Sequence, residues 1–179
     1  MSQIANNYGQ ALYELAKEEN LDTVILEQMD VLDASFSQEP GFLRLLAAPN
    51  LSKTERCGIL DESFREKVEP YLLNFMKILT EKGYIRQFSD CCKVYRNTYN
   101  ADHGILCVKA VSAVALTAAQ KEKLAAKLQT ITGKTIQLEN RLDPKVLGGI
   151  RLDYDGIQVD GTVQSRLDAV ADLLKNTVL

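Results

Sequence analysis

Apolar residues recur every three or four positions through the first hundred residues of the chain. Residues at this spacing share one face of a helix, so the pattern indicates amphipathic helices. Six such stripes follow one another, over 4–16, 21–36, 42–46, 57–68, 72–79 and 88–99. The first part of the chain is therefore predicted to be a bundle of six helices.

Local signals place several helix ends. Ser52 and Glu55 form a capping box, in which each side chain satisfies a free N–H group at the helix start. Pro70 suits the first position of the fifth helix, and Gly83 suits its end. Pro40 and Gly41 are expected to stop the second helix.

The pattern changes after Gly104, where we place a domain boundary. Residues 105–108 form a short apolar run, and 136–138 alternate between apolar and polar, as strands do. Between them, Thr117 begins a second capping box, and Gly133 closes the helix that it starts. The predicted fold class is α+β, mostly α: a six-helix bundle over 1–104 and a small α/β domain over 105–179.

A hairpin is expected near the C-terminus. Residues 150–154 and 157–159 alternate between apolar and polar on either side of Asp155-Gly156, a dipeptide typical of tight turns. Gly148-Gly149 is expected to bend the chain into the first strand. From Val163 to Val178, apolar residues return to helical spacing, which predicts a final amphipathic helix.

Charge and hydropathy exclude several classes of protein. The net charge is −3, with −5 over 1–104 (11 basic, 16 acidic) and +2 over 105–179 (10 basic, 8 acidic). This balance gives no overall attraction to nucleic acid or to an anionic membrane. The longest nearly apolar run, 110–119, is too short to span a bilayer of about 30 Å. The N-terminus lacks the layout of a signal peptide, so we expect a cytoplasmic protein.

Catalytic and metal sites are not indicated. No phosphate-binding glycine motif is present, and the single histidine, His103, lies at a helix end. An EF-hand centred on Gly156 would need Arg151 and Thr162 as ligands, so a structural turn is a simpler interpretation than a calcium site. The cysteines, at positions 57, 91, 92 and 107, show no metal-binding spacing and no nearby base, so we expect reduced packing residues. We therefore expect no cofactor, no metal and no enzymatic activity.

The C-terminal motifs resemble those of a known family. The string runs through Gly148-Gly149, Asp155-Gly156 and Asp160-Gly161-Thr162 into Ser165-Arg166-Leu167. It resembles the C-terminal signature of the delta subunit of F-type ATP synthases, whose mitochondrial counterpart is the oligomycin sensitivity-conferring protein. Its structural signature residues would be Gly148, Gly149, Asp155, Gly156, Asp160 and Gly161.

The resemblance extends over most of the chain. The family's first-helix pattern is matched by Ala5, Tyr8, Ala11, Leu12 and Ala16. Its later patterns resemble residues 45–49 with 52–53, and residues 74–75 with Leu79 and Gly83. Gly9 stands where the first-helix pattern has alanine. A glycine inside a helix is expected to weaken it by about 0.5–1 kcal/mol.

The resemblance implies a stator subunit without catalytic activity. In this family the helical domain holds the amphipathic N-terminal helix of an alpha subunit in a groove between the first and fifth helices. The C-terminal domain meets the b subunits of the peripheral stalk, so that ion flow is coupled to ATP synthesis. The implied location is peripheral, on the cytoplasmic side of the bacterial cell membrane, with no nucleic acid partner and no direct membrane insertion.

Helix docking in a groove uses apolar anchors three, four and seven residues apart. Our candidates on the first and fifth helices are Tyr8, Ala11, Leu12, Leu15, Asn74, Phe75, Ile78 and Leu79. A helical stripe alone cannot separate such anchors from the core of the bundle. Two other functions stay open at this point: a helical adaptor that binds a different amphipathic helix, and a small cysteine-dependent enzyme.

Overall fold

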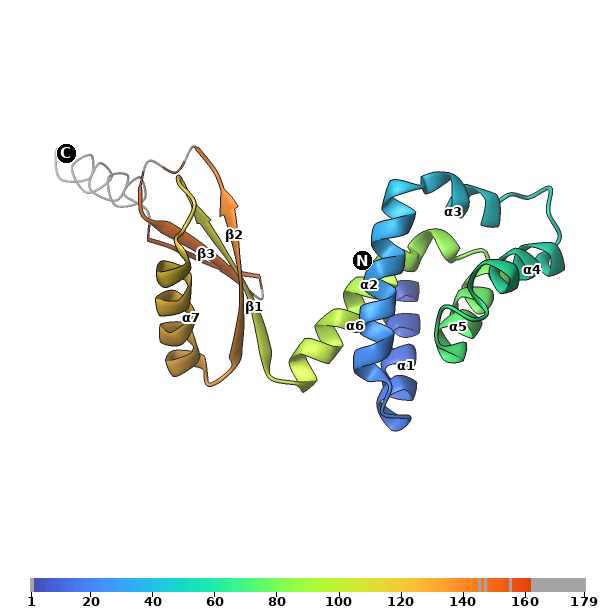
Figure 1. Ribbon diagram of the computed structural model, residues 1–179, viewed down its shortest axis with the longest axis horizontal. Coiled ribbons are helices and arrows are strands. Elements are labelled where there is room, and N and C mark those ends of the chain that lie inside the picture. The colour runs from blue at the N-terminus through green and yellow to red at the C-terminus, as the bar shows by residue number, and fades with distance from the viewer. Residues whose placement is uncertain (1, 145, 147, 155, 162–179) are drawn as a thin grey trace, which may run out of the picture. The chain divides into compact units, whose positions relative to one another are not determined.

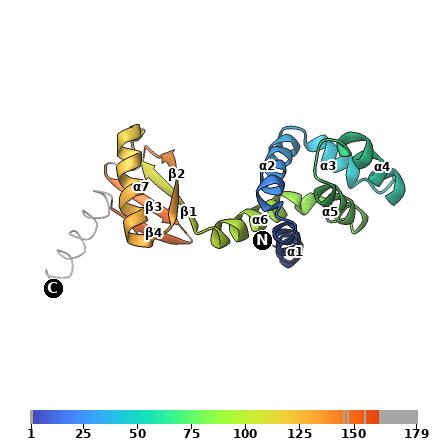
Figure 2. The ribbon, with the colours of Figure 1, turned by 60° about the horizontal axis from the view of Figure 1, so that its bottom comes forward.

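The protein is mostly helical, with a small four-stranded sheet in its second half. The computed structural model describes residues 2–144, 146, 148–154 and 156–161 (Figures 1 and 2). The chain divides into two compact units, Met1–Tyr99 and Asn100–Leu179, a few residues before the boundary that we placed at Gly104. The described residues hold seven α-helices, because a helix in the second unit adds to the six in the first.

The first unit consists of six α-helices and one short 3₁₀ helix. They are α1 (Gln3–Glu18), α2 (Asp22–Gln38), α3 (Pro40–Leu46), α4 (Lys53–Phe64), α5 (Pro70–Glu81), η1 (Ile85–Gln87) and α6 (Phe88–Asp102). Both bonds of the Ser52–Glu55 capping box are present, and Pro70 opens α5. Pro40 begins α3 as well as ending α2, because proline fits the first turn of a helix.

Aromatic side chains fill the centre of the bundle. Phe36 stacks on Phe42 with a 5.6 Å centroid distance, and it meets Phe64 and Phe88 edge to face. Tyr95 is fully buried, its ring meets that of Tyr13 edge to face, and its hydroxyl donates to the carbonyl of Asp22. Burying each large apolar side chain contributes roughly 1.5–3 kcal/mol, so this core dominates the stability of the unit.

The second unit is a sheet with one helix against it. Strands β1 (Ile105–Ser112), β2 (Thr135–Leu142), β3 (Ile150–Tyr154) and β4 (Ile157–Asp160) lie in the order β2-β1-β3-β4. Parallel strands need a crossover, and α7 (Ala118–Thr132) supplies it between β1 and β2. Both views show α7 lying along the sheet (Figures 1 and 2).

Alternation along β1 gives the sheet one buried face. Leu106, Val108 and Ala110 are buried, whereas Cys107 and Lys109 between them are exposed. On α7, the expected stripe is only partly buried. Leu124 and Leu128 are half-buried, but Ile131 is 72% exposed, because it lies in the last turn before Gly133 ends the helix. The predicted helix from Val163 to Val178 lies outside the described residues.

Candidate partner-binding surface

The eight candidate residues on α1 and α5 divide by burial into two sets. Leu12, Phe75 and Leu79 are buried in the core of the bundle. Ala11, Leu15, Asn74 and Ile78 are exposed, and Tyr8 is half-buried. The exposed and half-buried residues form what we call the α1–α5 surface.

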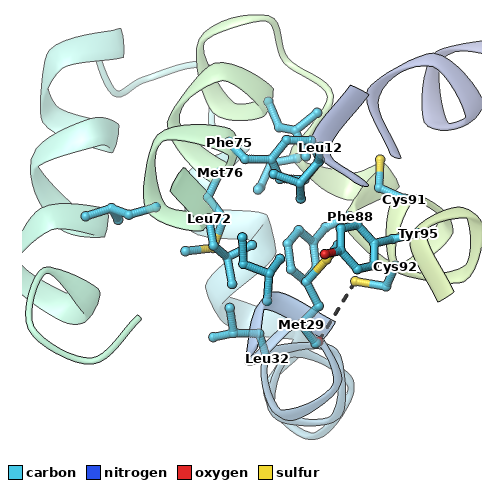
Figure 3. Packing of buried hydrophobic residues seen from close by; sticks show 14 of the residues in the cluster. Leu12, Met29, Leu32, Leu72, Phe75, Met76, Phe88, Cys91, Cys92 and Tyr95 are labelled. Carbon is cyan, nitrogen blue, oxygen red and sulfur yellow. Dashed lines mark hydrogen bonds between the residues drawn. The ribbon is translucent and has the colours of Figure 1, made fainter. Parts of the chain in front are cut away.

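The three buried residues belong to the core of the bundle, and their contact with a partner stays a prediction. Figure 3 shows Leu12 and Phe75 in the same part of the core, with Met76 below them. Leu79 is completely buried, as is Met76. Leu12 and Phe75 keep only 4% and 6% of their surface exposed, so these residues mainly support the α1–α5 surface from beneath.

Helical spacing explains why Ala11 and Leu15 lie outside. The buried residues of α1 are Ala5, Gly9, Leu12, Tyr13 and Ala16. Ala11 and Leu15 fall between these positions, on the flank of the helix, because each residue turns by about 100°. Leu15 is 38% exposed.

On α5 the same reasoning separates two flanks. Lys77 pairs with Asp61 of α4 at 2.6 Å, so that flank faces α4. Tyr71, Ile78 and Lys82, at intervals of seven and four residues, lie on the other flank. Because α5 also contacts α1, Ile78, which is 44% exposed, belongs to the side of α5 that borders α1.

The two helices run in opposite directions along this border. The rings of Tyr8 and Tyr84 lie 6.2 Å apart, which brings the N-terminal half of α1 beside the end of α5. The hydroxyl of Ser2 also bonds to Gln87 in η1, directly after α5. Leu15, further along α1, therefore lies towards the beginning of α5.

Sequence reasoning missed Tyr71 and Tyr84, which are half-buried against the core near this surface. Tyr71 could have been found, because it precedes Phe75 by one helical turn. No local signal identifies Tyr84, which follows Gly83 outside any helix. Its contact with Tyr8 joins residues that are far apart in sequence.

The C-terminal hairpin has the predicted geometry over its described residues. Tyr154 pairs with Ile157, and Gly156 between them has φ +77°, which a glycine adopts without steric cost. Gly149 also has a positive φ, of +85°, next to Gly148 in the bend before β3.

The hairpin is also hydrogen-bonded at the end away from its turn. Asp160 pairs with Arg151, and the Gly161 N–H donates to the carbonyl of Ile150 at 3.1 Å. A side chain at position 161 would approach that carbonyl closely. Asp155, another signature residue, lies outside the described residues, as does the segment from Thr162 to Leu167. These glycines therefore have structural roles in the turn and at its base.

The cysteines do not form a reactive site. Burial raises the pKa of the Cys91 thiol to about 11 and that of Cys92 further still. Cys92 donates a weak hydrogen bond to the carbonyl of Met29 (Figure 3). Burial, followed by the nearby Glu81 carboxylate, raises the pKa of Cys57. Thiols held protonated are poor nucleophiles, and Cys91 and Cys92 are packing residues of the core.

The described residues also bear on metal binding and membrane insertion. Within 2–144, 146, 148–154 and 156–161, no group of three or more histidine, cysteine or acidic side chains is placed to hold a metal ion. None of the helices in this part of the chain is both long and apolar enough to cross a membrane.

Comparison with known proteins identifies the family. The family described as "ATP synthase delta (OSCP) subunit" matches residues 4–174. The ATP synthase subunit delta of Clostridioides difficile is 30% identical, over 98% of this chain and 97% of that protein. That of Alkaliphilus oremlandii is 31% identical, over 98% of each chain.

A solved structure shows the same fold. A chain of the Toxoplasma gondii mitochondrial ATP synthase hexamer superposes with a TM-score of 0.75 at 18% identity, over 97% of this chain and 98% of that one. The match of the family spans both units, so the stator role and the absence of catalytic activity that the sequence predicted are confirmed. The chain belongs to the ATP synthase delta (OSCP) subunit family.

Proposed function

We propose that this chain joins the catalytic head of an F-type ATP synthase to its peripheral stalk, at the cytoplasmic side of the bacterial cell membrane. The first unit binds the amphipathic N-terminal helix of an alpha subunit through the α1–α5 surface. The second unit binds the b subunits. This joint keeps the alpha-beta hexamer from turning with the rotor, so that proton or ion flow is coupled to ATP synthesis.

The observation that carries the proposal is the pair of exposed aliphatic side chains on neighbouring helices. Leu15 on α1 and Ile78 on α5 are exposed, whereas Leu12 on α1 and the leucines of α5 are buried in one core. Burying such side chains against a partner helix would release about 25 cal/mol for each Å² of apolar surface removed from water. Small residues beside them, such as Ala11, allow a helix to approach closely.

Binding of the isolated alpha N-terminal segment tests this assignment. A synthetic peptide from the alpha subunit of the same organism is titrated into the full chain by calorimetry. Leu15→Ser with Ile78→Ser is expected to weaken binding at least tenfold, since each 1.4 kcal/mol is tenfold in affinity. The melting temperature should change little, because both side chains are exposed.

The matched control changes two exposed valines on α2, Val24→Ser and Val31→Ser. The exposed fraction of Val24, 40%, is similar to those of Leu15 and Ile78, and that of Val31, 66%, is larger. The control should bind the peptide as the unchanged chain does. Equal losses in both variants, or no binding by the unchanged chain, would contradict the proposed use of the α1–α5 surface.

The alternative, an adaptor for a different helix, is tested by copurification. Added to membranes stripped of the delta subunit, the full chain should restore attachment of the alpha-beta head. The Leu15 and Ile78 variant should restore it poorly.

A further inference from the structure

The charges along the α1–α5 surface are arranged unevenly. Glu14 and Glu18 are exposed in the second half of α1, one turn apart. They lie three residues beyond Ala11 and Leu15, respectively, so they border the same stripe. The first half of α1 exposes only uncharged polar side chains there, from Gln3, Asn6, Asn7 and Gln10.

The opposite end of the surface is basic. Lys82 follows Ile78 by one turn at the end of α5, and Arg86 follows in η1; both are exposed. The contacts of Tyr8 with Tyr84 and of Ser2 with Gln87 place this end beside the first half of α1. The surface therefore has an acidic end at Glu14 and Glu18 and a basic end at Lys82 and Arg86.

The acidic end is unfavourable for the chain by itself. Like charges four residues apart repel each other on a helix, and carboxylates near a helix C-terminus oppose the helix dipole. Over the described ranges, no ion pair involves Glu14 or Glu18. Positions that break local rules without a compensating contact within the chain are typical of functional sites.

We propose that this charge pattern sets the direction of the bound helix. The partner is an amphipathic helix with basic residues at the end over Glu14 and Glu18, and acidic residues at the end over Lys82 and Arg86. The inference rests on the proposed function, because it concerns the same surface and the same alpha-subunit segment. Complementary charges across an interface fix orientation and suppress the reversed mode of binding.

The test measures how the affinity for the alpha N-terminal peptide depends on salt. For the unchanged chain, binding should weaken as sodium chloride rises from 20 to 500 mM (about 22 to 4 Å of Debye length). Glu14→Gln with Glu18→Gln should weaken binding roughly three- to tenfold at low salt. It should also flatten the salt dependence, because the removed attraction is the part that salt screens.

A matched control keeps the same change of charge at another place. Glu62 and Glu66 are also exposed and four residues apart, Glu62 in the last turn of α4 and Glu66 in the turn that follows it. The flank of α5 that borders α4 carries Lys77 and faces away from α1. Glu62→Gln with Glu66→Gln should leave both the affinity and the salt dependence unchanged.

Direction is tested by exchanging charges. Lys82→Glu with Arg86→Glu should weaken binding of the natural peptide at low salt. A peptide in which basic residues replace the acidic ones at one end should recover affinity for this variant and lose it for the unchanged chain. This inference is overturned if the peptide affinity does not change in the variants of Glu14, Glu18, Lys82 and Arg86, or if it changes equally in the control. The proposed function is then left intact. No peptide binding by the unchanged chain at any salt overturns the proposed function itself.

Discussion

Gly9 of α1 lies in close contact with Val94 of α6. A Cβ atom built on Gly9 would lie 2.9 Å from the Cβ atom of Val94 and 2.9 Å from the carbonyl oxygen of Cys91. Real Cβ atoms do not approach other atoms so closely, so the glycine lets the two helices pack together. Gly9 is expected to weaken helix α1 as a glycine, but it also allows α1 and α6 to pack closely, which the sequence pattern did not show.

Gly9→Ala is therefore expected to destabilise the first unit, although alanine favours helix formation by about 1 kcal/mol. Overpacking typically costs about 1–3 kcal/mol, so we expect a net loss of about 1–2 kcal/mol in the free energy of unfolding. Urea unfolding followed by circular dichroism measures it. Adding Val94→Ala should restore only a small part of the loss, because it removes Cγ1, 3.0 Å from the built Cβ, but keeps the Cβ atom of residue 94 and the Cys91 carbonyl.

Gly58 provides the control, because it lies inside α4 with no atom within 4 Å of a built Cβ. Gly58→Ala should leave stability unchanged or raise it by roughly 0.4–1 kcal/mol. Stabilisation by Gly9→Ala to the same degree would mean that α1 and α6 do not pack as described.

Local patterns were sufficient to predict most elements of this fold. The stripes on α1 and α5, both capping boxes and the hairpin at Gly156 depend on residues within a few positions of one another. Such short-range relations can be recognised from the sequence alone. The strand order β2-β1-β3-β4 was not predicted, because pairing between strands is set by contacts between distant residues.

The candidate surface shows the same limit. The spacing of apolar residues identified the stripe that contains both Leu12 and Leu15, but one residue is buried and the other exposed. The difference depends on where α5 and α6 lie around α1, which α1 alone does not determine. The sequence showed that Gly9 departs from the family's pattern. The reason for the glycine is its close contact with Val94, which is far away in the sequence.

Alkaline pH is expected to destabilise the bundle through its buried thiols. Burial raises the pKa of Cys91 to about 11, whereas the thiol has a pKa of about 9 when unfolded. The unfolded state therefore loses its proton first, so stability is retained below pH 9 and falls as pH rises towards 11. Cys92, whose pKa is raised further, adds to the same trend. Urea midpoints between pH 8 and 9.5 should fall less in a variant with Cys91→Ala and Cys92→Ala.

The same thiols should resist modification in the folded protein. A colorimetric disulfide reagent at pH 8 should react first with Cys107, which is exposed, and with Cys91 and Cys92 only after urea is added. Rapid reaction of four thiols without urea would contradict the burial of Cys91 and Cys92.

The junction between the two units is expected to be a site of proteolysis. The last residues of α6 and the turn that follows, 101–103, are exposed, and β1 begins at Ile105. Brief digestion with subtilisin should yield a stable fragment ending close to Gly104, because exposed connections are cut first. Mass spectrometry locates the cut. Cuts spread through α2 and α5 at the same rate would contradict independent units.

Asn140 is expected to be the polar residue on which the second unit most depends. Its side-chain oxygen accepts from the Leu116 N–H at 2.8 Å, and its nitrogen donates to the Ala110 carbonyl and the Ser112 hydroxyl, both at 2.9 Å. Asn140→Ala removes all three bonds, although the Ser112 hydroxyl still donates to the Val114 carbonyl, so we expect a loss of about 1–3 kcal/mol. Thermal melting should show the loss, and hydrogen exchange of the Leu116 amide should accelerate. Gln137→Ala, on the exposed side of the same strand, should have little effect.

Ala11 and Ala16 give the sharpest test of the α1–α5 surface, because they lie on one helix and differ in burial. Ala11 is exposed, whereas Ala16 is completely buried. Ala11→Arg should change the free energy of unfolding by less than about 0.5 kcal/mol, as exposed substitutions usually do, since the arginine extends into water. In the complex the same side chain would occupy the space of the alpha helix, so peptide affinity should fall at least tenfold.

Ala16→Arg places the same side chain in the core, where it has neither room nor a partner for its charge. Such a substitution should cost several kcal/mol and unfold the first unit. Melting temperature and peptide titration together separate the cases. A folded Ala11→Arg chain that still binds the alpha peptide removes Ala11 from the binding surface, and an unfolded one places it in the core. A folded chain that has lost binding, beside an unfolded Ala16→Arg chain, assigns this flank of α1 to the partner helix.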